Sequence, residues 1–383
     1  MNTPLCFWAS TLMLFLLSSA NAQTATSRIV SAANAFLSTL DEKQRLSVLF
    51  AFDDEEQRVR WSNFPISIVP RAGLPFKDMT PAQHSAAMNL LAVALSKRGL
   101  EKVQQIMEAD EVLKTNEANG RGGGGPPPGR GDGFAGRKGD GPPEGGPPPG
   151  RGLGGNRGGR GPGGGLLFGK DLYYFSFLGK PSEKTIWTLQ FGGHHLAVNV
   201  TIDGDRGILT PTLTGAQPAL YTSNGKTVRP LGGESDKALA VLNALDEGQR
   251  KQAILNYRVP DLVLGPGKDG KTIQPEGLRA SNMTGKQRDM LLEVISEWAG
   301  IVHESAAAAR MTQLRADISD TWFAWSGAAT AEPGRNITAY YRIQGPHLVI
   351  EYSPQQMGGD PGLHVHTMYR DPTNDYGRKP AAK

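Results

Sequence analysis

FLSTLDEKQR, at residues 36–45, recurs without a gap as VLNALDEGQR at residues 241–250. The two segments share two leucines and the Asp, Glu, Gln and Arg side chains. Shorter matches continue the pattern, with Gly73-Leu74, Met79-Thr80 and Gln83 recurring as Gly277-Leu278, Met283-Thr284 and Gln287, and Gly193-His194-His195-Leu196 as Gly345-Pro346-His347-Leu348. The chain therefore contains an internal repeat, and this repeat decides the expected fold.

Each copy of the repeat is expected to form helices followed by strands. Apolar residues from Ile29 to Leu40 fall on one helical face. Thr80-x-x-Gln83 and Thr284-x-x-Gln287 match the capping box, in which hydroxyl and amide side chains bond the free backbone groups at a helix start. Residues 187–202 and 338–352 are rich in β-branched and aromatic side chains and precede turn-forming Gly and Asp, which predicts a β-hairpin in each copy.

Neither predicted sheet is large enough to be stable alone. We therefore predict one α+β domain over residues 23–383, made of two fused, internally duplicated helix-plus-β-hairpin repeats that pack about a pseudo-twofold axis. The repeats span about 28–222 and 233–377.

Residues 120–165 form a Gly/Pro-rich segment in which PPPGRG occurs twice. The spacing between matching residues falls from 204–205 before this segment to 152 after it, so we predict a disordered insertion into one repeat rather than a linker between domains. Its seven basic and three acidic residues differ by 7 − 3 = 4, which is the formal net charge of +4 of the whole chain. The balanced remainder argues against a nucleic-acid partner, and the insertion is left as a candidate contact for a surface partner.

Residues 1–22 carry no charged side chain, contain an apolar stretch and end in Ala20-Asn21-Ala22. This pattern predicts a signal peptide that is cleaved after Ala22, and hence a secreted or periplasmic protein. The absence of a leading Lys or Arg leaves an uncleaved anchor as the alternative. The only cysteine, Cys6, lies in this segment, and no later apolar run approaches the roughly 20 residues of a transmembrane helix. The sequons at Asn199, Asn282 and Asn336 are relevant only in a eukaryotic host.

His364 and His366 are separated by one residue on a predicted strand, so their rings point to the same face. With a third ligand from His347 or His195 they would form a transition-metal site, for which Zn, Cu and Fe are equally suitable. Aligning Leu209–Pro218 with Leu363–Pro372 places Thr210 and Thr212 opposite the two histidines, so duplication alone does not account for them. The alternative for His195 and His347 is a structural role fixed by the repeat.

Two further side chains are candidates for catalysis. Arg370 could hold a carboxylate or phosphate, and Glu351 could act as a general base or a ligand. Residues 265–272 match the phosphate-loop pattern, but Pro275 and Gly277 interrupt the helix that such a loop requires, so we predict a surface loop there. No Gly-x-Ser-x-Gly motif is present, and the expected mature chain has no cysteine nucleophile.

Several of these motifs resemble a known family. The segment at residues 192–196, Leu213-Thr214-Gly215 with Pro218, and His364-Val365-His366 with the RDPTNDYG run at residues 370–377 are similar to the uncharacterised domain-of-unknown-function family 3500. The resemblance covers nearly the whole expected mature chain apart from the Gly/Pro insertion. It implies a shared domain and no particular activity.

The sequence thus predicts an exported metal-binding protein. If the protein is an enzyme, we expect a metal-dependent hydrolase or oxidoreductase that acts on a small anionic substrate. The alternative is a non-catalytic extracytoplasmic binding or scaffold protein.

Overall fold

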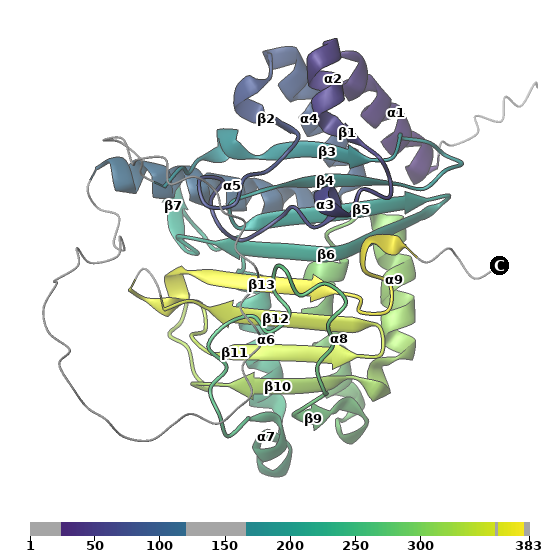
Figure 1. Ribbon diagram of the computed structural model, residues 1–383. Helices are drawn as coiled ribbons and strands as arrows, with labels where there is room; N and C mark the ends of the chain where they lie inside the picture. Colours follow the sequence, from purple (N-terminus) through teal and green to yellow (C-terminus); the bar gives the residue numbers. More distant parts are fainter. Residues whose placement is uncertain (1–23, 120–165, 357–358, 379–383) are drawn as a thin grey trace, which may run out of the picture.

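A computed structural model describes residues 24–119, 166–356 and 359–378. The expected signal peptide and the expected insertion at 120–165 lie outside the described residues. Within these ranges a mixed sheet of eleven strands crosses the molecule in the order β1-β3-β4-β5-β6-β13-β12-β11-β10-β9, with β2 paired to β3 (Figure 1). The helices and this sheet confirm the α+β class.

The strands of the sheet are β1 (Leu49–Phe50), β2 (Leu74–Pro75), β3 (Tyr174–Leu178), β4 (Trp187–Gly193), β5 (Leu196–Asp203), β6 (Arg206–Ala216), β9 (Leu278–Arg279), β10 (Trp322–Ser326), β11 (Tyr340–Gly345), β12 (Leu348–Pro354) and β13 (Val365–Arg370). Among the strands of the described residues the pair β1–β3 is parallel and the other pairs are antiparallel, and an isolated bridge between Ile254 and Trp325 is also parallel. A separate two-stranded hairpin is formed by β7 (Tyr221–Ser223) and β8 (Lys226–Val228).

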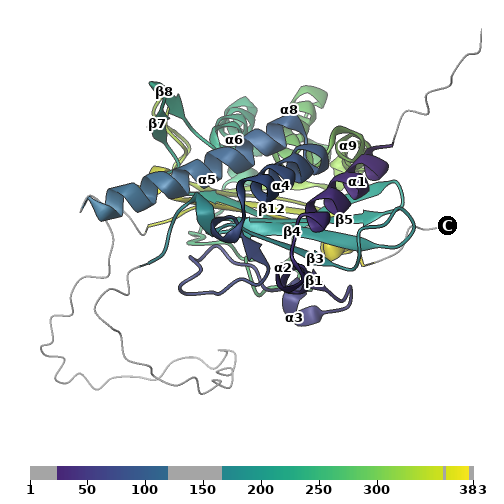
Figure 2. The same ribbon diagram turned by 90° about the horizontal axis from the view of Figure 1, so that it is seen from above.

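One face of the sheet is covered by helices, as Figure 2 shows. They are α1 (Ala25–Ser38), α4 (Pro81–Ala94), α5 (Lys97–Ala118), α6 (Gly232–Ala244), α8 (Gly285–Ala299) and α9 (Glu304–Ala316). Their apolar sides and the sheet form the main core, which includes Phe36, Leu91, Trp298 and Tyr369. Burial of this apolar surface is the main stabilising contribution expected for the fold.

The opposite face carries two long connections and the short helix α3 (Glu55–Arg58) instead of a layer of long helices (Figure 2). One connection follows α3, the other follows α7 (Glu247–Ala253), and both cross in front of the sheet in Figure 1. Trp61 from the first and Leu262 from the second pack on Ala197, Leu213 and Met368 of the sheet. This second layer matters for function, because side chains of β13 that share the side of Met368 lie beneath it.

The same hydrogen-bonded corner occurs in both halves of the chain. Asp41 caps α2 (Glu42–Val48) and Asp246 caps α7, each in a capping box with the Gln three residues later. Gln83 Nε2 donates to Gln44 Oε1 at 2.7 Å and to Thr39 O at 2.9 Å. Gln287 Nε2 makes the matching bonds to Gln249 Oε1 at 2.8 Å and to Ala244 O at 2.7 Å. The shared Asp-Glu-x-Gln-Arg and Met-Thr-x-x-Gln sequences therefore have a structural reason.

The two halves meet where β6 pairs with β13 in antiparallel orientation. Thr214 and Thr367 lie opposite one another there, with their hydroxyl oxygens 2.6 Å apart. Trp298 of α8 donates from Nε1 to the Thr367 hydroxyl at 2.9 Å, which ties this junction to the helical layer.

The strand register corrects one detail of the sequence alignment. Val198 and Ile350 occupy equivalent positions, because each lies two residues after the leucine that begins its strand. Val198 pairs with Thr212, and Ile350 pairs with Tyr369. Thr212 therefore corresponds to Tyr369 rather than to His366. A register shift in β5–β6 between Val198 and Val200 moves the alignment further from the one expected from sequence. The comparison of two threonines with two histidines was wrong.

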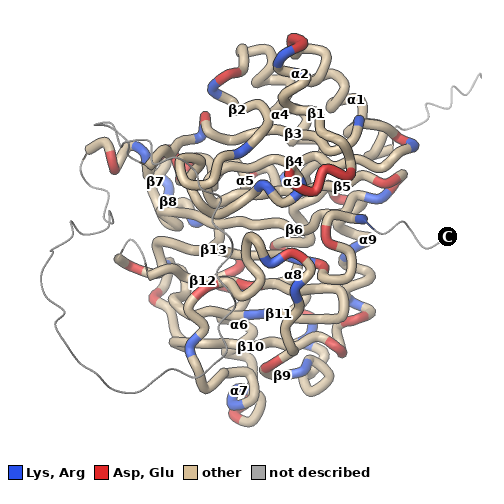
Figure 3. The backbone as a smooth tube through the Cα atoms, viewed as in Figure 1, with Lys and Arg blue, Asp and Glu red and all other residues tan. Residues whose placement is uncertain are grey.

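Short 3-10 helices complete the described part of the chain: η1 (Phe76–Asp78), η2 (Lys170–Leu172), η3 (Ala280–Asn282), η4 (Ile318–Asp320), η5 (Pro361–Leu363) and η6 (Asp375–Gly377). Basic and acidic side chains are interspersed over the described backbone (Figure 3). Within the described residues, no helix is both long enough and apolar enough to cross a membrane.

Candidate metal centre

His364 and His366 lie at the start of β13, at the centre of the sheet. His366 pairs with Gly215 on one side and with Ser353 on the other. Because Met368 packs beneath Trp61 in the second layer, the alternation of side chains places His366 on that same loop-covered face. The Nε2 atoms of His364 and His366 are 3.1 Å apart, so the expected pairing of the two rings is confirmed.

The third histidine, His195, comes from the tight turn between β4 and β5. Its φ is +59°, a left-handed conformation that costs a residue with a Cβ about 1 kcal/mol. This conformation turns the ring toward β13, where its Nε2 lies 3.1 Å from Nε2 of His364. Gly215 leaves the room for this approach, because a Cβ at that position would lie 3.3 Å from Cδ2 of His195 and 2.8 Å from Val365 O.

The three rings form a nearly equilateral triangle. Their centroids are separated by 5.0 Å between His195 and His364, 5.0 Å between His195 and His366, and 4.8 Å between His364 and His366. One ligand nitrogen from each ring lies within 4.8 Å of the other two. The three side chains are only 3, 7 and 5 % exposed for His195, His364 and His366.

One linear hydrogen bond does not account for both contacts of His364 Nε2. A neutral imidazole nitrogen carries either one proton or one lone pair, whereas Nε2 of His364 lies 3.1 Å from a nitrogen on both sides. Ligand atoms bound to one tetrahedral zinc ion at about 2.0–2.1 Å are roughly 3.3 Å apart, close to the separation seen here. The buried triad could therefore bind a metal ion.

Burial keeps the rings of His195 and His366 in the form that metals bind. Desolvation, with a smaller contribution from the neighbouring histidines, holds the pKa of His195 well below its usual value. Desolvation also lowers the pKa of His366, although Asp261 opposes the effect. A neutral imidazole offers a lone pair, which is what ligation requires.

The covering loops supply partners to the outer nitrogen of His366. Nδ1 of His366 lies 3.4 Å from the side-chain amide of Asn63 and 3.9 Å from Oδ1 of Asp261. Ligation through Nε2 requires the proton on Nδ1, where the Asp261 carboxylate, or the Asn63 oxygen after rotation of its amide, would accept it. Such outer contacts orient a ligating ring and raise its basicity.

His194 supports the turn that carries His195. Its Nδ1 lies 2.6 Å from Oδ1 of Asp110 on α5, and Asp110 also accepts from the backbone amide of Gly169 at 2.9 Å. The ring of His194 packs on that of His195 with centroids 3.7 Å apart. Asp110 thus connects the helical layer to the histidine triad through two adjacent residues.

His347 does not join the triad. It lies in the turn between β11 and β12, where Nδ1 is 2.9 Å from the hydroxyl of Thr373. The sequence left either His347 or His195 as the third ligand, and in the structure His195 is the one that lies beside His364 and His366.

Glu351 and Arg370 face the second layer and hold its second connection to the sheet by hydrogen bonds. The Glu351 carboxylate accepts from the amides of Val263 and Leu264 and from the hydroxyl of Tyr340, each at 2.7 Å, and the residue is fully buried. Arg370, 1 % exposed, donates to the carbonyls of Leu264 and Gly265 at 2.7 and 3.0 Å. We therefore assign neither residue to substrate binding or proton transfer.

The loop held by these two residues includes the phosphate-loop pattern at 265–272. Arg370 also bonds Asp269 at 3.2 Å and Asp375 at 2.7 Å. No helix begins in this segment, so the predicted surface loop is confirmed.

Comparison with known proteins gives the chain a family but no activity. The family model described as "Protein of unknown function (DUF3500)" matches residues 22–378. The chain therefore belongs to this family, as the motifs had indicated. Neither the curated proteins nor the solved structures include a match to this chain.

Three residues around the triad had no signal in the sequence. Asn63, Asp110 and Asp261 are ordinary polar residues in a loop, a long helix and a second loop, at distances of 84 to 303 positions from their histidine partners. Only the fold brings them to the site. The adjacent His194 was visible in the sequence, but nothing there paired it with Asp110.

Proposed function

We propose that this protein binds one transition-metal ion through His195, His364 and His366. The observation that carries the proposal is the position of the His364 Nε2 atom, 3.1 Å from Nε2 of both other rings. The buried, neutral state favoured for His195 and His366 supports it. Three imidazole ligands suit Zn, Cu or Fe.

The number of ligands supports a reactive rather than a purely structural ion. Structural zinc sites are closed by four protein ligands, whereas catalytic sites keep a position for water or substrate. The triad supplies three side chains, and Asp261 lies on the far side of the His366 ring as an orienting group. We therefore propose a metal-dependent enzyme, a hydrolase or an oxidoreductase, in which the ion would supply Lewis acidity or redox chemistry.

Export and duplication belong to the same proposal. The pattern of residues 1–22 supports an extracytoplasmic protein. The matching Gln–Gln corners and the antiparallel β6–β13 junction support a duplicated domain with a pseudo-twofold axis at that junction. In such a domain the metal would bind residues from both repeats.

Metal analysis tests the proposal directly. Untagged protein of residues 23–383 is expected to hold close to one equivalent of metal by plasma mass spectrometry, and the His364→Ala/His366→Ala variant none. His347→Ala is the matched control, because that histidine lies in a turn outside the triad and its loss should leave the metal content unchanged. A folded parent that holds no metal after reconstitution with Zn, Cu and Fe would contradict the proposal.

A further inference from the structure

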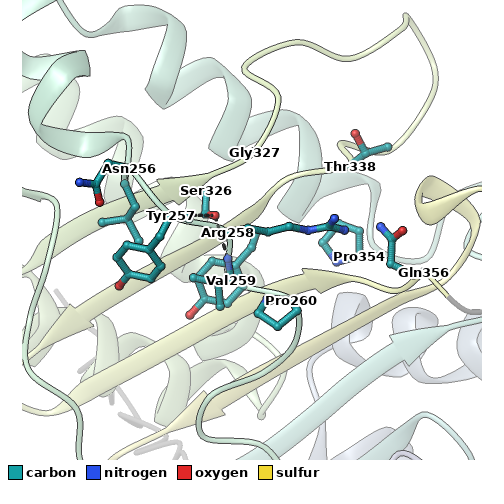
Figure 4. A pocket seen from close by; sticks show the side chains of 12 residues that line it. Asn256, Tyr257, Arg258, Val259, Pro260, Ser326, Gly327, Thr338, Pro354 and Gln356 are labelled. Carbon is teal, nitrogen blue, oxygen red and sulfur yellow. Dashed lines mark hydrogen bonds between the residues drawn. The ribbon is translucent and has the colours of Figure 1, made fainter. Parts of the chain in front are cut away.

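A pocket of about 460 Å³ opens at one end of β10 and β12 (Figure 4). Residues 255–260, which follow α7, form one wall, and the ends of the strands with Thr338 and Gln356 form the other. Its volume is within the range of pockets that hold small organic molecules.

The charged group that lines this pocket is positive. Arg258 is the single cation among the lining residues, and none of them is acidic. Within the described ranges, no carboxylate pairs with Arg258, in contrast to Arg370, whose donors are taken by protein oxygens. Figure 4 shows the Arg258 side chain extended across the pocket toward Pro354 and Gln356. Its guanidinium is therefore available to an oxyanion, which it can bind through two parallel hydrogen bonds.

The pocket walls are fixed before any ligand binds. The Ser326 hydroxyl donates to Tyr257 O at 2.8 Å and accepts from the Val259 amide at 3.0 Å, which holds the chain on both sides of Arg258. Tyr340 is held by its bond to Glu351. Preformed walls reduce the entropy that a ligand must lose on binding.

A single layer of residues separates the pocket from the histidine triad. Asp261 follows the lining residue Pro260, and Gln355 follows the lining residue Pro354. Gln355 donates from Nε2 to Asp261 Oδ1 at 2.9 Å and from its backbone amide to His364 O at 2.7 Å. The same Asp261 oxygen lies 3.9 Å from Nδ1 of His366.

We propose that this pocket binds a small organic monocarboxylate, with Arg258 holding the carboxylate and the tyrosine and proline side chains contacting its apolar body. One cation among the lining residues matches a single negative charge better than a phosphate dianion. Arg258 thus takes the role that the sequence had suggested for Arg370. The binding of a carboxylate stands on the pocket alone, while its position as substrate rests on the proposed metal function.

Benzoate is the probe for this pocket. In NMR titrations of the 23–383 protein we expect benzoate to bind with a Kd of about a millimolar, as for a small fragment with one charged contact. Arg258→Gln should weaken binding about tenfold or more, because it removes the charge-assisted pair. Arg279→Gln is the matched control, since Arg279 is an exposed cation of β9 that pairs with Asp320 away from the pocket. Arg258 is itself exposed, so its variant should fold, which circular dichroism checks.

The alternatives give different results. Benzamide that binds as well as benzoate, or benzoate that binds equally to Arg258→Gln, overturns the proposal. If inorganic phosphate binds more tightly than benzoate, the pocket is a phosphate site and the carboxylate proposal is overturned. Benzoate binding that is lost in His364→Ala/His366→Ala but kept in Arg258→Gln places the carboxylate on the metal and also overturns it. If the parent protein holds no metal after reconstitution but still binds benzoate through Arg258, the carboxylate pocket is supported and the proposed metal function fails.

Discussion

At the scale of single residues, Asp261 is the side chain whose effect on the triad is easiest to isolate. It lies 3.9 Å from Nδ1 of His366 and is 58 % exposed, so its replacement should not disturb the core. We expect Asp261→Asn to weaken metal binding roughly 10- to 100-fold, because the amide accepts the Nδ1 proton less strongly and lowers the basicity of the ligand. Competition with a chromophoric chelator measures this change.

The control for this variant is Asp205→Asn, in the exposed turn between β5 and β6. It removes the same charge beyond the opposite end of β5 from His195 and should leave the metal affinity unchanged. An unchanged affinity in Asp261→Asn would mean that His366 takes its orientation from Asn63 or from the strand alone.

His303 provides a separate prediction, about stability. It caps α9 and is buried. Its Nε2 atom lies against Gly207 and has no hydrogen-bond partner among the described residues. Desolvation lowers its pKa below the usual 6.5. The unfolded chain then binds the proton more readily, so the stability contributed by neutral His303 is present above about pH 6.5 and is lost as the pH falls through the depressed pKa.

Replacement of His303 by Asn, which retains a capping side chain, should therefore flatten the decline in the free energy of unfolding between about pH 7 and pH 5. Urea denaturation over this range measures the slope. His84→Asn, at an exposed position on α4, serves as the control and should retain the slope of the parent protein. A slope that His303→Asn leaves unaltered would assign the pH dependence to other groups.

At the scale of elements, the connection after α7 is held to the sheet by Glu351 and Arg370 rather than by its own secondary structure. Glu351→Leu would leave the buried amides of Val263 and Leu264 and the Tyr340 hydroxyl without an acceptor. We expect a loss of about 3 kcal/mol in the free energy of unfolding and faster proteolysis between residues 255 and 277. Glu293→Leu, an exposed glutamate of α8, should change stability by no more than about 0.5 kcal/mol. Equal stability of the two variants would show that Glu351 does not anchor the loop.

The elements also show what a sequence can and cannot reveal. The capping boxes and the turn at residues 203–205 were predictable, because their partners lie three residues apart or across a short turn. The turn at His194-His195, which divides the predicted strand at 187–202 into β4 and β5, was not. The pairing of His364 with His366 followed from strand alternation alone. The loops over the second face carry no periodic pattern, so their contacts with Glu351 and Arg370 were not predictable, and the sequence offered both residues as catalytic candidates. His347 was misplaced because it lies in a turn and not on a strand.

At the scale of the whole molecule, the proposed metal would connect the two halves of the chain. His195 follows β4 of the first half, while His364 and His366 lie at the start of the last strand of the second. The halves also meet through the β6–β13 pair in the sheet and through the Lys102–Glu234 ion pair in the helical layer. An ion held by all three side chains binds only the folded state, in which these residues meet. It therefore stabilises that state by about 2.7 kcal/mol when the free metal is at 100 times its Kd.

Removal of the metal should accordingly lower the Tm of the protein by several degrees, and stoichiometric metal should restore it. Differential scanning calorimetry of the metal-free and reloaded protein measures both changes, and His364→Ala/His366→Ala provides the reference that should not respond to either treatment. Since His195 is the only ligand from the first half, His195→Ala should abolish the metal-dependent part of the Tm even if the His364–His366 pair retains weak binding. If His195→Ala keeps the full shift, the ion is bound by β13 alone and does not join the halves.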